Sequence, residues 1–215
     1  MLEIKNVSFR YANSSQWILR NFDFSATKGE LIAVTGANGS GKTTLLNIIG
    51  GVIPKVIVGD FSGEIFWEGD SLSQLSLPQT APLISLLMQE PDNQLFFPTV
   101  EQELAFAPEN LRLDSTEIEN RISQALRILD IESLRFADTS TLSFGQKKLV
   151  AFAALLTLSP RVLLVDEIST GLSERFMERV IDALKYEMQS GKIIFAADNH
   201  PAILQLASQQ ISLGN

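Results

Sequence analysis

The 215-residue chain contains no cysteine and only one histidine. The absence of cysteine excludes disulfide bonds, thiol nucleophiles and Cys-ligated zinc, and it suits a reducing compartment. Basic residues are also scarce, because 17 Lys and Arg stand against 25 Asp and Glu and give a formal net charge of −8. Since affinity for a phosphate backbone comes from massed Lys and Arg, we expect no general nucleic-acid binding.

The chain also lacks an apolar run of membrane-spanning length. Its most apolar stretch, 149–160, lies between Lys148 and Arg161. It is too short to cross about 30 Å of hydrocarbon and suits a buried helix. The first twenty residues contain charged side chains and no apolar core of signal-peptide length. We therefore expect a cytoplasmic protein whose membrane contact, if any, is peripheral and at the cytoplasmic face.

Hydrophobic residues make up 45% of the chain, enough to fill the core of a single domain covering residues 1–215. Apolar patterning predicts strands at 2–11, 18–24, 31–35, 64–67, 83–88, 162–165 and 193–197. Helices are predicted at 44–49, which Gly50 and Gly51 end, and after Asp114, where apolar residues recur at helical spacing up to Leu129. This alternation predicts an α/β fold with a mainly parallel sheet, interrupted by a small helical subdomain at about 92–140.

A glycine-rich loop follows the apolar run 31–35 and precedes a helix. The run Gly36-Ala37-Asn38-Gly39-Ser40-Gly41-Lys42-Thr43 matches the phosphate-binding loop pattern. Its glycines let backbone N–H groups converge on a phosphate, Lys42 adds a positive charge, and Thr43 offers a hydroxyl to Mg²⁺. The alternative is a glycine turn before a helix. The loop predicts an ATP site formed by Gly36, Asn38, Gly39, Ser40, Gly41, Lys42, Thr43 and Thr44.

Two adjacent carboxylates end the apolar run 162–165. Asp166 suits a magnesium ligand, and Glu167 suits a base or a water-orienting group for attack on the γ-phosphate. Paired acids after a strand are by themselves usually a solvated strand end. Together with the glycine-rich loop, they predict phosphoryl-transfer chemistry.

The order of these motifs resembles that of the ATP-binding-cassette (ABC) ATPase subunits, and the resemblance covers almost the whole chain. Residues 141–148 look like the family's signature segment, with Ser143, Gly145 and Gln146 at its phosphate-binding positions. The resemblance implies a P-loop NTPase core with an antiparallel N-terminal part. It also implies that ATP is held between this segment and the glycine-rich loop of a second ATPase subunit. A capped helix without a ligand is the alternative.

Three further positions match the family pattern. The resemblance implies that Gln89 contacts Mg²⁺ and water, that His200 lies near the γ-phosphate, and that Tyr11 stacks on adenine. Glu167, His200 and Gln89 are thus the predicted catalytic residues, and Thr43, Gln89 and Asp166 the predicted metal ligands.

A narrower resemblance, carried by residues 89–101 with Glu103, Phe106 and 108–111, is to the ATPases of energy-coupling-factor importers. It implies that a transmembrane scaffold protein docks near Leu95, Phe96 and Phe97 and that the cargo is a vitamin or a metal ion. The alternative is that this apolar segment is part of the core.

The chain departs from the family pattern at several points. Phe144 replaces the first signature glycine, Ile168 replaces a proline, and Ser173 replaces an aspartate. The sequence also stops at Asn215, without the C-terminal extension common in the energy-coupling-factor group. We hypothesise an intact nucleotide-binding half-site and a weakened signature half-site, as in an asymmetric heterodimer; whether the second ATPase is another copy or a paralogue stays open.

We therefore predict a subunit that hydrolyses Mg·ATP and powers a membrane importer. Two alternatives are a soluble ABC protein without a membrane partner and a regulatory nucleotide-binding module with weakened hydrolysis. The sequence does not identify the transported substrate.

Overall fold

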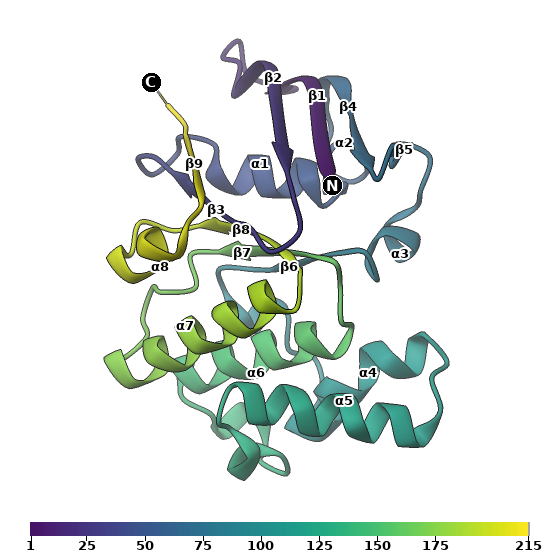
Figure 1. Cartoon of the computed structure of the whole chain (residues 1–215), viewed down its shortest axis with the longest axis vertical. Coiled ribbons are helices and arrows are strands. Elements are labelled where there is room, and N and C mark those ends of the chain that lie inside the picture. The colour runs from purple at the N-terminus through teal and green to yellow at the C-terminus, as the bar shows by residue number, and fades with distance from the viewer. Residues whose placement is uncertain (215) are drawn as a thin grey trace.

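The computed structural model describes residues 1–214 and contains two β-sheets (Figure 1). The antiparallel sheet has the strand order β2-β1-β4-β5. The second sheet has the order β6-β7-β8-β3-β9 and is parallel throughout. The strands are β1 (Leu2–Tyr11), β2 (Leu19–Ala26), β3 (Leu31–Thr35), β4 (Gly59–Trp67), β5 (Asp70–Ser71), β6 (Ile84–Leu87), β7 (Val162–Asp166), β8 (Ile193–Ala197) and β9 (Gln209–Ser212). The predicted α/β class and parallel sheet are confirmed.

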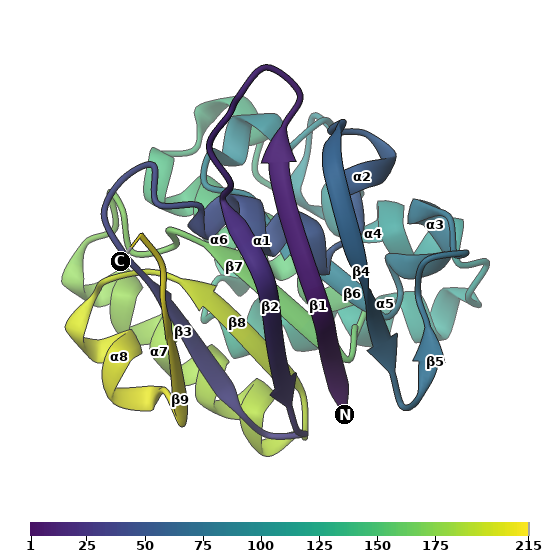
Figure 2. The same ribbon diagram turned by 90° about the horizontal axis from the view of Figure 1, so that it is seen from above.

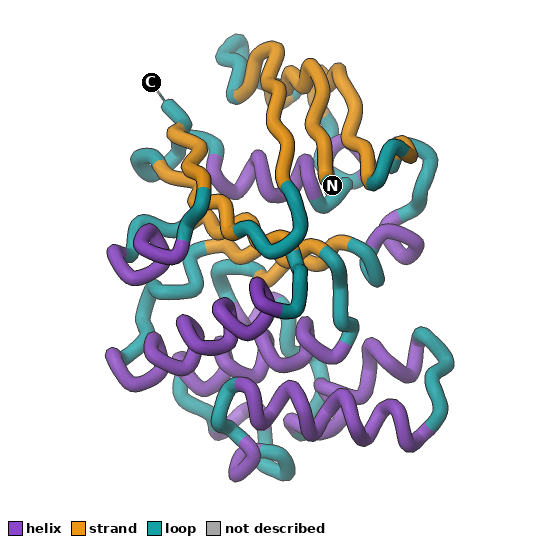
Figure 3. The backbone as a smooth tube through the Cα atoms, in the orientation of Figure 1, coloured by secondary structure: helices purple, strands orange, loops and turns teal. Residues whose placement is uncertain are grey.

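Helices lie between most successive strands and are the purple segments of Figure 3, while non-helical turns join β1 to β2, β2 to β3 and β4 to β5. They are α1 (Lys42–Ile49), α2 (Val52–Lys55), α3 (Leu77–Thr80), α4 (Val100–Asn110), α5 (Ser115–Ile128), α6 (Phe144–Thr157), α7 (Glu174–Gln189) and α8 (Pro201–Leu206), with short 3₁₀ turns at Pro91–Asn93, Glu132–Leu134 and Thr139–Thr141. Within residues 1–214, no helix combines the length and apolarity needed to cross a membrane.

The central strands separate two hydrophobic cores. In β7, Leu163 and Val165 point into one core while Val162 and Leu164 point into the other, as the period of two in a strand requires. The first core joins this sheet to α4, α5, α6 and α7. The second contains α1 and the inner face of the antiparallel sheet, so α1 lies between the two sheets (Figures 1 and 2). The glycine-rich loop therefore leads into a helix that is packed on both sides.

The helical segment after β6 shares the first core. Leu104 of α4 and Leu126 of α5 pack into the same cluster as Phe152 of α6. At the surface, Arg135 pairs with Glu101 of α4 and Glu119 of α5, at 2.7 and 2.6 Å. Hydrogen bonds from Arg135 lower the pKa of Glu119 to about 2. The boundaries of a separate subdomain at 92–140 stay a prediction.

Strands β4 and β9 differ from the sequence prediction. Strand β4 begins at Gly59, five residues before the predicted start, because its first half alternates exposed residues with partly buried ones. Strand β9 was not predicted, since its four residues include two glutamines and only Ile211 is buried. Helix α5 begins as expected, with the Asp114 carboxylate accepting from the backbone N–H of Glu117 at 3.0 Å.

Candidate functional site

The glycine-rich loop joins β3 to α1 at the carboxyl edge of the parallel sheet. Gly36, Gly39 and Gly41 all have positive φ angles, of 146°, 80° and 104°. At Gly36 a Cβ would lie 2.5 Å from the carbonyl oxygen of Leu213, so both conformation and space require glycine there. The Lys42 side chain is buried, and its Nζ donates to the carbonyl oxygens of Gly36 and Ala37 at 3.1 and 3.2 Å.

Two carboxylates at the carboxyl end of β7 face this loop. Asp166 is the last residue of β7 and is 4% exposed. Glu167 leaves the strand with a φ of 44°, and its carboxylate accepts from Gln89 Nε2 at 2.8 Å and lies 3.9 Å from Lys42 Nζ. Burial raises the pKa of Asp166 above its usual value, and the Glu167 and Asp198 carboxylates act in the same direction; a hydrogen bond with Thr43 and the charge of Lys42 oppose this rise.

The Asp166 carboxylate fits a magnesium site. Its Oδ1 is buried and has no hydrogen-bond partner within the described chain. No cluster of three or more His, Cys, Asp or Glu residues that could hold a metal occurs among residues 1–214. A single buried carboxylate beside a threonine hydroxyl nevertheless suits Mg²⁺, which usually takes one or two carboxylates and completes its shell with waters and phosphate oxygens.

A cavity of about 400 Å³ lies over the loop. Nine of the predicted site residues line it, namely Tyr11, Asn38, Gly39, Gly41, Lys42, Thr43, Thr44, Gln89 and Glu167. The Tyr11 ring is 37% exposed, and its hydroxyl forms a 2.8 Å hydrogen bond with Thr44 Oγ1. The volume lies within the usual range for small-molecule and cofactor sites.

The predicted signature residues lie elsewhere, at the start of α6. Ser143 and Gln146 form a capping box, in which Ser143 Oγ accepts from Gln146 N at 3.3 Å and Gln146 Oε1 accepts from Ser143 N at 2.9 Å. A Cβ at Gly145 would lie 2.7 Å from the Phe176 ring, so close packing against α7 also requires this glycine. None of the three lines the loop cavity.

The residues that depart from the family pattern have local structural roles. The Phe144 ring is 38% exposed and covers Gly171, where a Cβ would lie 2.7 Å from it. Ile168 is 1% exposed in the first core. Ser173 caps α7, its Oγ accepting from Phe176 N at 3.4 Å.

His200 lies outside the lining of the loop cavity and contributes to a neighbouring cavity of about 600 Å³ beside α7. Its Nδ1 accepts from Ala202 N at 3.3 Å at the start of α8. The buried Asp198 accepts from His200 N at 2.8 Å and from Ser169 Oγ at 2.7 Å. Asp198 was not among the residues predicted from the sequence, although its place directly after the apolar run 193–197 was an available signal.

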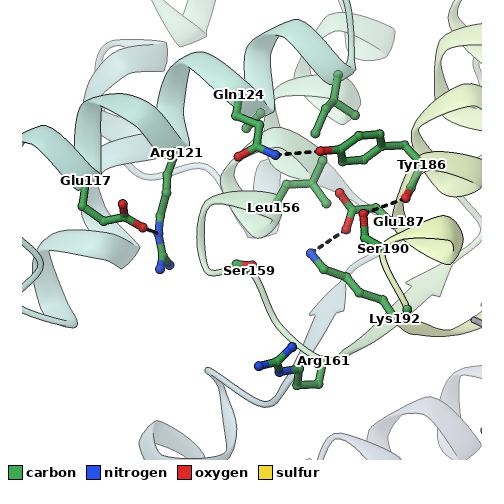
Figure 4. A pocket seen from close by; sticks show the side chains of 13 residues that line it. Glu117, Arg121, Gln124, Leu156, Ser159, Arg161, Tyr186, Glu187, Ser190 and Lys192 are labelled. Atoms are coloured by element: carbon green, nitrogen blue, oxygen red, sulfur yellow. Dashed lines mark hydrogen bonds and ion pairs between the residues drawn. The ribbon is translucent and has the colours of Figure 1, made fainter. Parts of the chain in front are cut away.

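A second polar cavity, of about 230 Å³, lies at the opposite edge of the sheet (Figure 4). Most of its polar groups bond to one another. Gln124 Nε2 donates to the Tyr186 hydroxyl at 2.9 Å, and Lys192 pairs with the buried Glu187 at 2.5 Å. Arg121 pairs with Glu117 and donates to the Thr157 carbonyl oxygen. These bonds join α5 to the ends of α6 and α7, so we assign the cavity a structural role.

Because Asp166 is buried, we predict that its negative charge lowers the free energy of unfolding. A carboxyl whose folded-state pKa is raised destabilises the fold increasingly as the pH rises from its unfolded-state pKa through its folded-state pKa. We expect Asp166→Asn to increase the free energy of unfolding at neutral pH, measured by urea denaturation without nucleotide or Mg²⁺. The gain should vanish below the ordinary carboxyl pKa. The exposed control Asp70→Asn should change little, and a less stable Asp166→Asn protein at neutral pH would contradict the predicted cost of this buried charge.

Comparison with known proteins agrees with this geometry. The sequence model of the ABC transporter family matches residues 19–170. A protein of Pyrococcus abyssi named as an ABC transporter ATP-binding protein is 34% identical over 200 residues, which are 93% of this chain and 71% of the relative. The energy-coupling factor transporter ATP-binding protein EcfA1 of Methanospirillum hungatei is 32% identical over 199 residues, covering 92% and 70% of the two chains.

The fold is similar to a solved structure as well. That structure is cbiO1 from Clostridium perfringens, described as part of the ABC transporter complex cbiONQ. It superposes with a TM-score of 0.85 at 28% identity, covering 99% of this chain and 84% of the other. The chain therefore belongs to the ABC transporter family, as an ATP-binding subunit that hydrolyses ATP to drive transport.

Proposed function

We propose that this chain powers an importer of the energy-coupling-factor type and works as one half of an ATPase dimer. The observation that carries the proposal is the convergence of Lys42, Asp166 and Glu167 at one edge of the sheet. The similarity to EcfA1 and to cbiO1 supports the importer type and a membrane-bound partner at the cytoplasmic face. A vitamin or a transition-metal ion is the proposed class of cargo.

The glycine-rich loop and the end of β7 would bind different parts of Mg·ATP. Loop amides and the Lys42 ammonium bind the phosphates, since both lie at the positive N-terminus of α1. Thr43, Asp166 and Gln89 are the residues that would hold Mg²⁺, which when bound neutralises charge between the β- and γ-phosphates. Tyr11 provides an aromatic surface for adenine at the cavity wall.

Glu167 is the proposed base or water-orienting residue. Its carboxylate is half-buried, faces the loop cavity and is oriented by the 2.8 Å bond from Gln89. His200 is the proposed switch residue near the γ-phosphate, where it would help Glu167 to organise the water and the developing charge. Because it is not among the residues that line the loop cavity, its role requires His200 to approach the bound nucleotide. The resemblance assigns Ser143, Gly145 and Gln146 to the nucleotide held by the second ATPase.

Substitutions should separate binding from hydrolysis. Lys42→Ala should raise the Kd for ATP by at least about tenfold, because a charge-assisted contact to phosphate is lost. Glu167→Gln should leave this Kd nearly unchanged and lower kcat by at least about a hundredfold, because general-base catalysis contributes on that scale. Equilibrium nucleotide binding and phosphate release measure the two effects. An unchanged Kd in the first variant, or full turnover in the second, would refute the assigned role.

An apolar groove of about 370 Å³ supports docking near Leu95, Phe96 and Phe97. Phe96 is 74% exposed and lines the groove with Phe106 of α4. Leu95 instead packs partly against the first core, and the Phe97 ring contacts that of Phe106 at 5.0 Å between centroids. The buried Glu103 carboxylate accepts from the N–H groups of both Phe96 and Phe97 at 2.8 Å. We propose that this groove receives an apolar helix of the transmembrane scaffold protein.

Phe136 provides a matched control for the groove, since its side chain is also 74% exposed but does not line it. Phe96→Glu should greatly reduce recovery of the chain with a polytopic membrane protein after gentle extraction from native membranes, because a charge would enter the apolar contact. Phe136→Glu should leave recovery unchanged. Equal recovery of both variants and the wild type would contradict the proposed docking surface.

We also propose that the second ATPase is a paralogue. The resemblance assigns Phe144 to the surface beside the partner's nucleotide, and it implies that the aspartate replaced by Ser173 links the two sites across the dimer. A homodimer would therefore carry both defects at both sites. Phosphate release per intact Glu167 site should therefore be slower for the chain alone than for the natively extracted complex. Equal phosphate release per intact Glu167 site from the chain alone and from the natively extracted complex would contradict the proposed asymmetry.

A further inference from the structure

Lys148 is a buried lysine outside the loop cavity. It lies in the second turn of α6 and is 2% exposed. Its Nζ donates to three carbonyl oxygens of one short segment, those of Glu167 at 2.7 Å, Ile168 at 3.3 Å and Thr170 at 2.7 Å. An ammonium group has three protons to donate, so these carbonyls can use its full hydrogen-bonding capacity.

The segment held by Lys148 connects β7 to α7 and begins at Glu167. Glu167 has a φ of 44°, a left-handed conformation that is unfavourable for a residue with a side chain. Two backbone bonds also fix the segment, from Glu167 N to the Ala197 carbonyl at 2.9 Å and from Thr170 N to the Glu167 carbonyl at 3.2 Å. The conformation that directs the Glu167 carboxylate into the loop cavity therefore depends on contacts made by the surrounding structure.

The surroundings of Lys148 keep the ammonium in place. Burial lowers the pKa of Lys148, while the nearby carboxylates of Asp198, Glu90 and Glu167 raise it. The Phe144 ring covers the ammonium with its centroid 5.3 Å from Nζ, at a distance suited to a cation–π contact. A buried lysine with three carbonyl acceptors and an aromatic cover is held in one position.

We propose that Lys148 is a positioning residue for ATP hydrolysis, which binds the carbonyls of Glu167, Ile168 and Thr170 and so keeps the Glu167 carboxylate aimed at the nucleotide. This inference rests on the proposed role of Glu167. Through these bonds α6 supports the segment 167–170 of the same chain, so a shift of α6 would displace Glu167 directly. Hydrolysis would depend on Lys148, whereas ATP binding at the loop would not.

The test compares Lys148→Met with Lys147→Met in the full-length chain. Met keeps the length of the side chain and removes the donors, and Lys147 is the adjacent lysine of α6, where it pairs with Asp92 at 2.6 Å. Lys148→Met should lower kcat by about tenfold or more, because small displacements of a catalytic group are costly. The Kd for ATP should change by less than about twofold, since a role confined to the chemical step leaves binding intact. Lys147 makes none of the three carbonyl bonds, so Lys147→Met should leave amide hydrogen exchange at residues 167–171 as in the wild type.

Two further measurements separate positioning from a general effect on folding. Amide hydrogen exchange at residues 167–171 should accelerate in Lys148→Met while exchange in β3 and α1 stays unchanged. Lys148→Arg, which keeps a cation and several donors, should recover part of the lost kcat. A Lys148→Met protein with wild-type kcat, or one whose lost activity follows only its unfolded fraction, would overturn the inference.

Glu167→Gln, assayed in parallel, distinguishes the two proposals. If Glu167→Gln is inactive and Lys148→Met is fully active, only the role of Lys148 fails. If Glu167→Gln keeps full turnover, the proposed function of Glu167 is wrong. The proposed contribution of Lys148 to hydrolysis is then wrong as well, because it acts through Glu167. In that case faster exchange at 167–171 would still show that Lys148 holds the loop.

Discussion

The parallel pairing of β3, β7 and β8 is the constraint on which the site depends. In this register Val34 of β3 and Asp166 of β7 are both opposite Ala197 of β8. The three strands therefore end at one edge of the sheet, and the segments that follow them must lie side by side. These segments are the glycine-rich loop, Glu167 and the Asp198–His200 turn. Residues far apart in the sequence meet there because the backbone ladders align the strand ends.

The packing on the two faces of this sheet has different consequences for the site. On one face, α1 lies between two sheets, so the helix that begins with Lys42 is fixed by apolar contacts on both sides. On the other face, α6 and α7 support the loop after β7 through Lys148 and through the close approach of Gly145 to Phe176. The glycine-rich loop is thus supported by one core, and the segment that carries the proposed catalytic residue Glu167 by the other.

The features predicted best from the sequence are those formed by residues close together along the chain. The glycine-rich loop is recognisable because its function requires glycines, a lysine and a threonine at fixed spacing, and the start of α5 because Asp114 lies three residues before the N–H that it caps. Contacts between distant segments carry no such local signal. Lys148, which reaches carbonyls 19 to 22 residues away, became identifiable only in the folded structure, and so did the bonds by which Asp198 joins Ser169 to His200. Strand β9 escaped prediction for a related reason, since its pairing with β3 rather than its own apolar pattern defines it.

The buried Glu103 carboxylate has a consequence for recognition at the groove. This carboxylate accepts hydrogen bonds from the N–H groups of Phe96 and Phe97 and so fixes their backbone. The side chain of Phe96 itself stays exposed to solvent. The conformational entropy of this segment is then lost when the chain folds and not when a partner arrives. A rigid, exposed phenylalanine of this kind can contribute more of its buried area to affinity than one on a loose loop. Two hydrogen bonds to one carboxylate thereby preorganise this short irregular segment for the proposed docking of a partner helix.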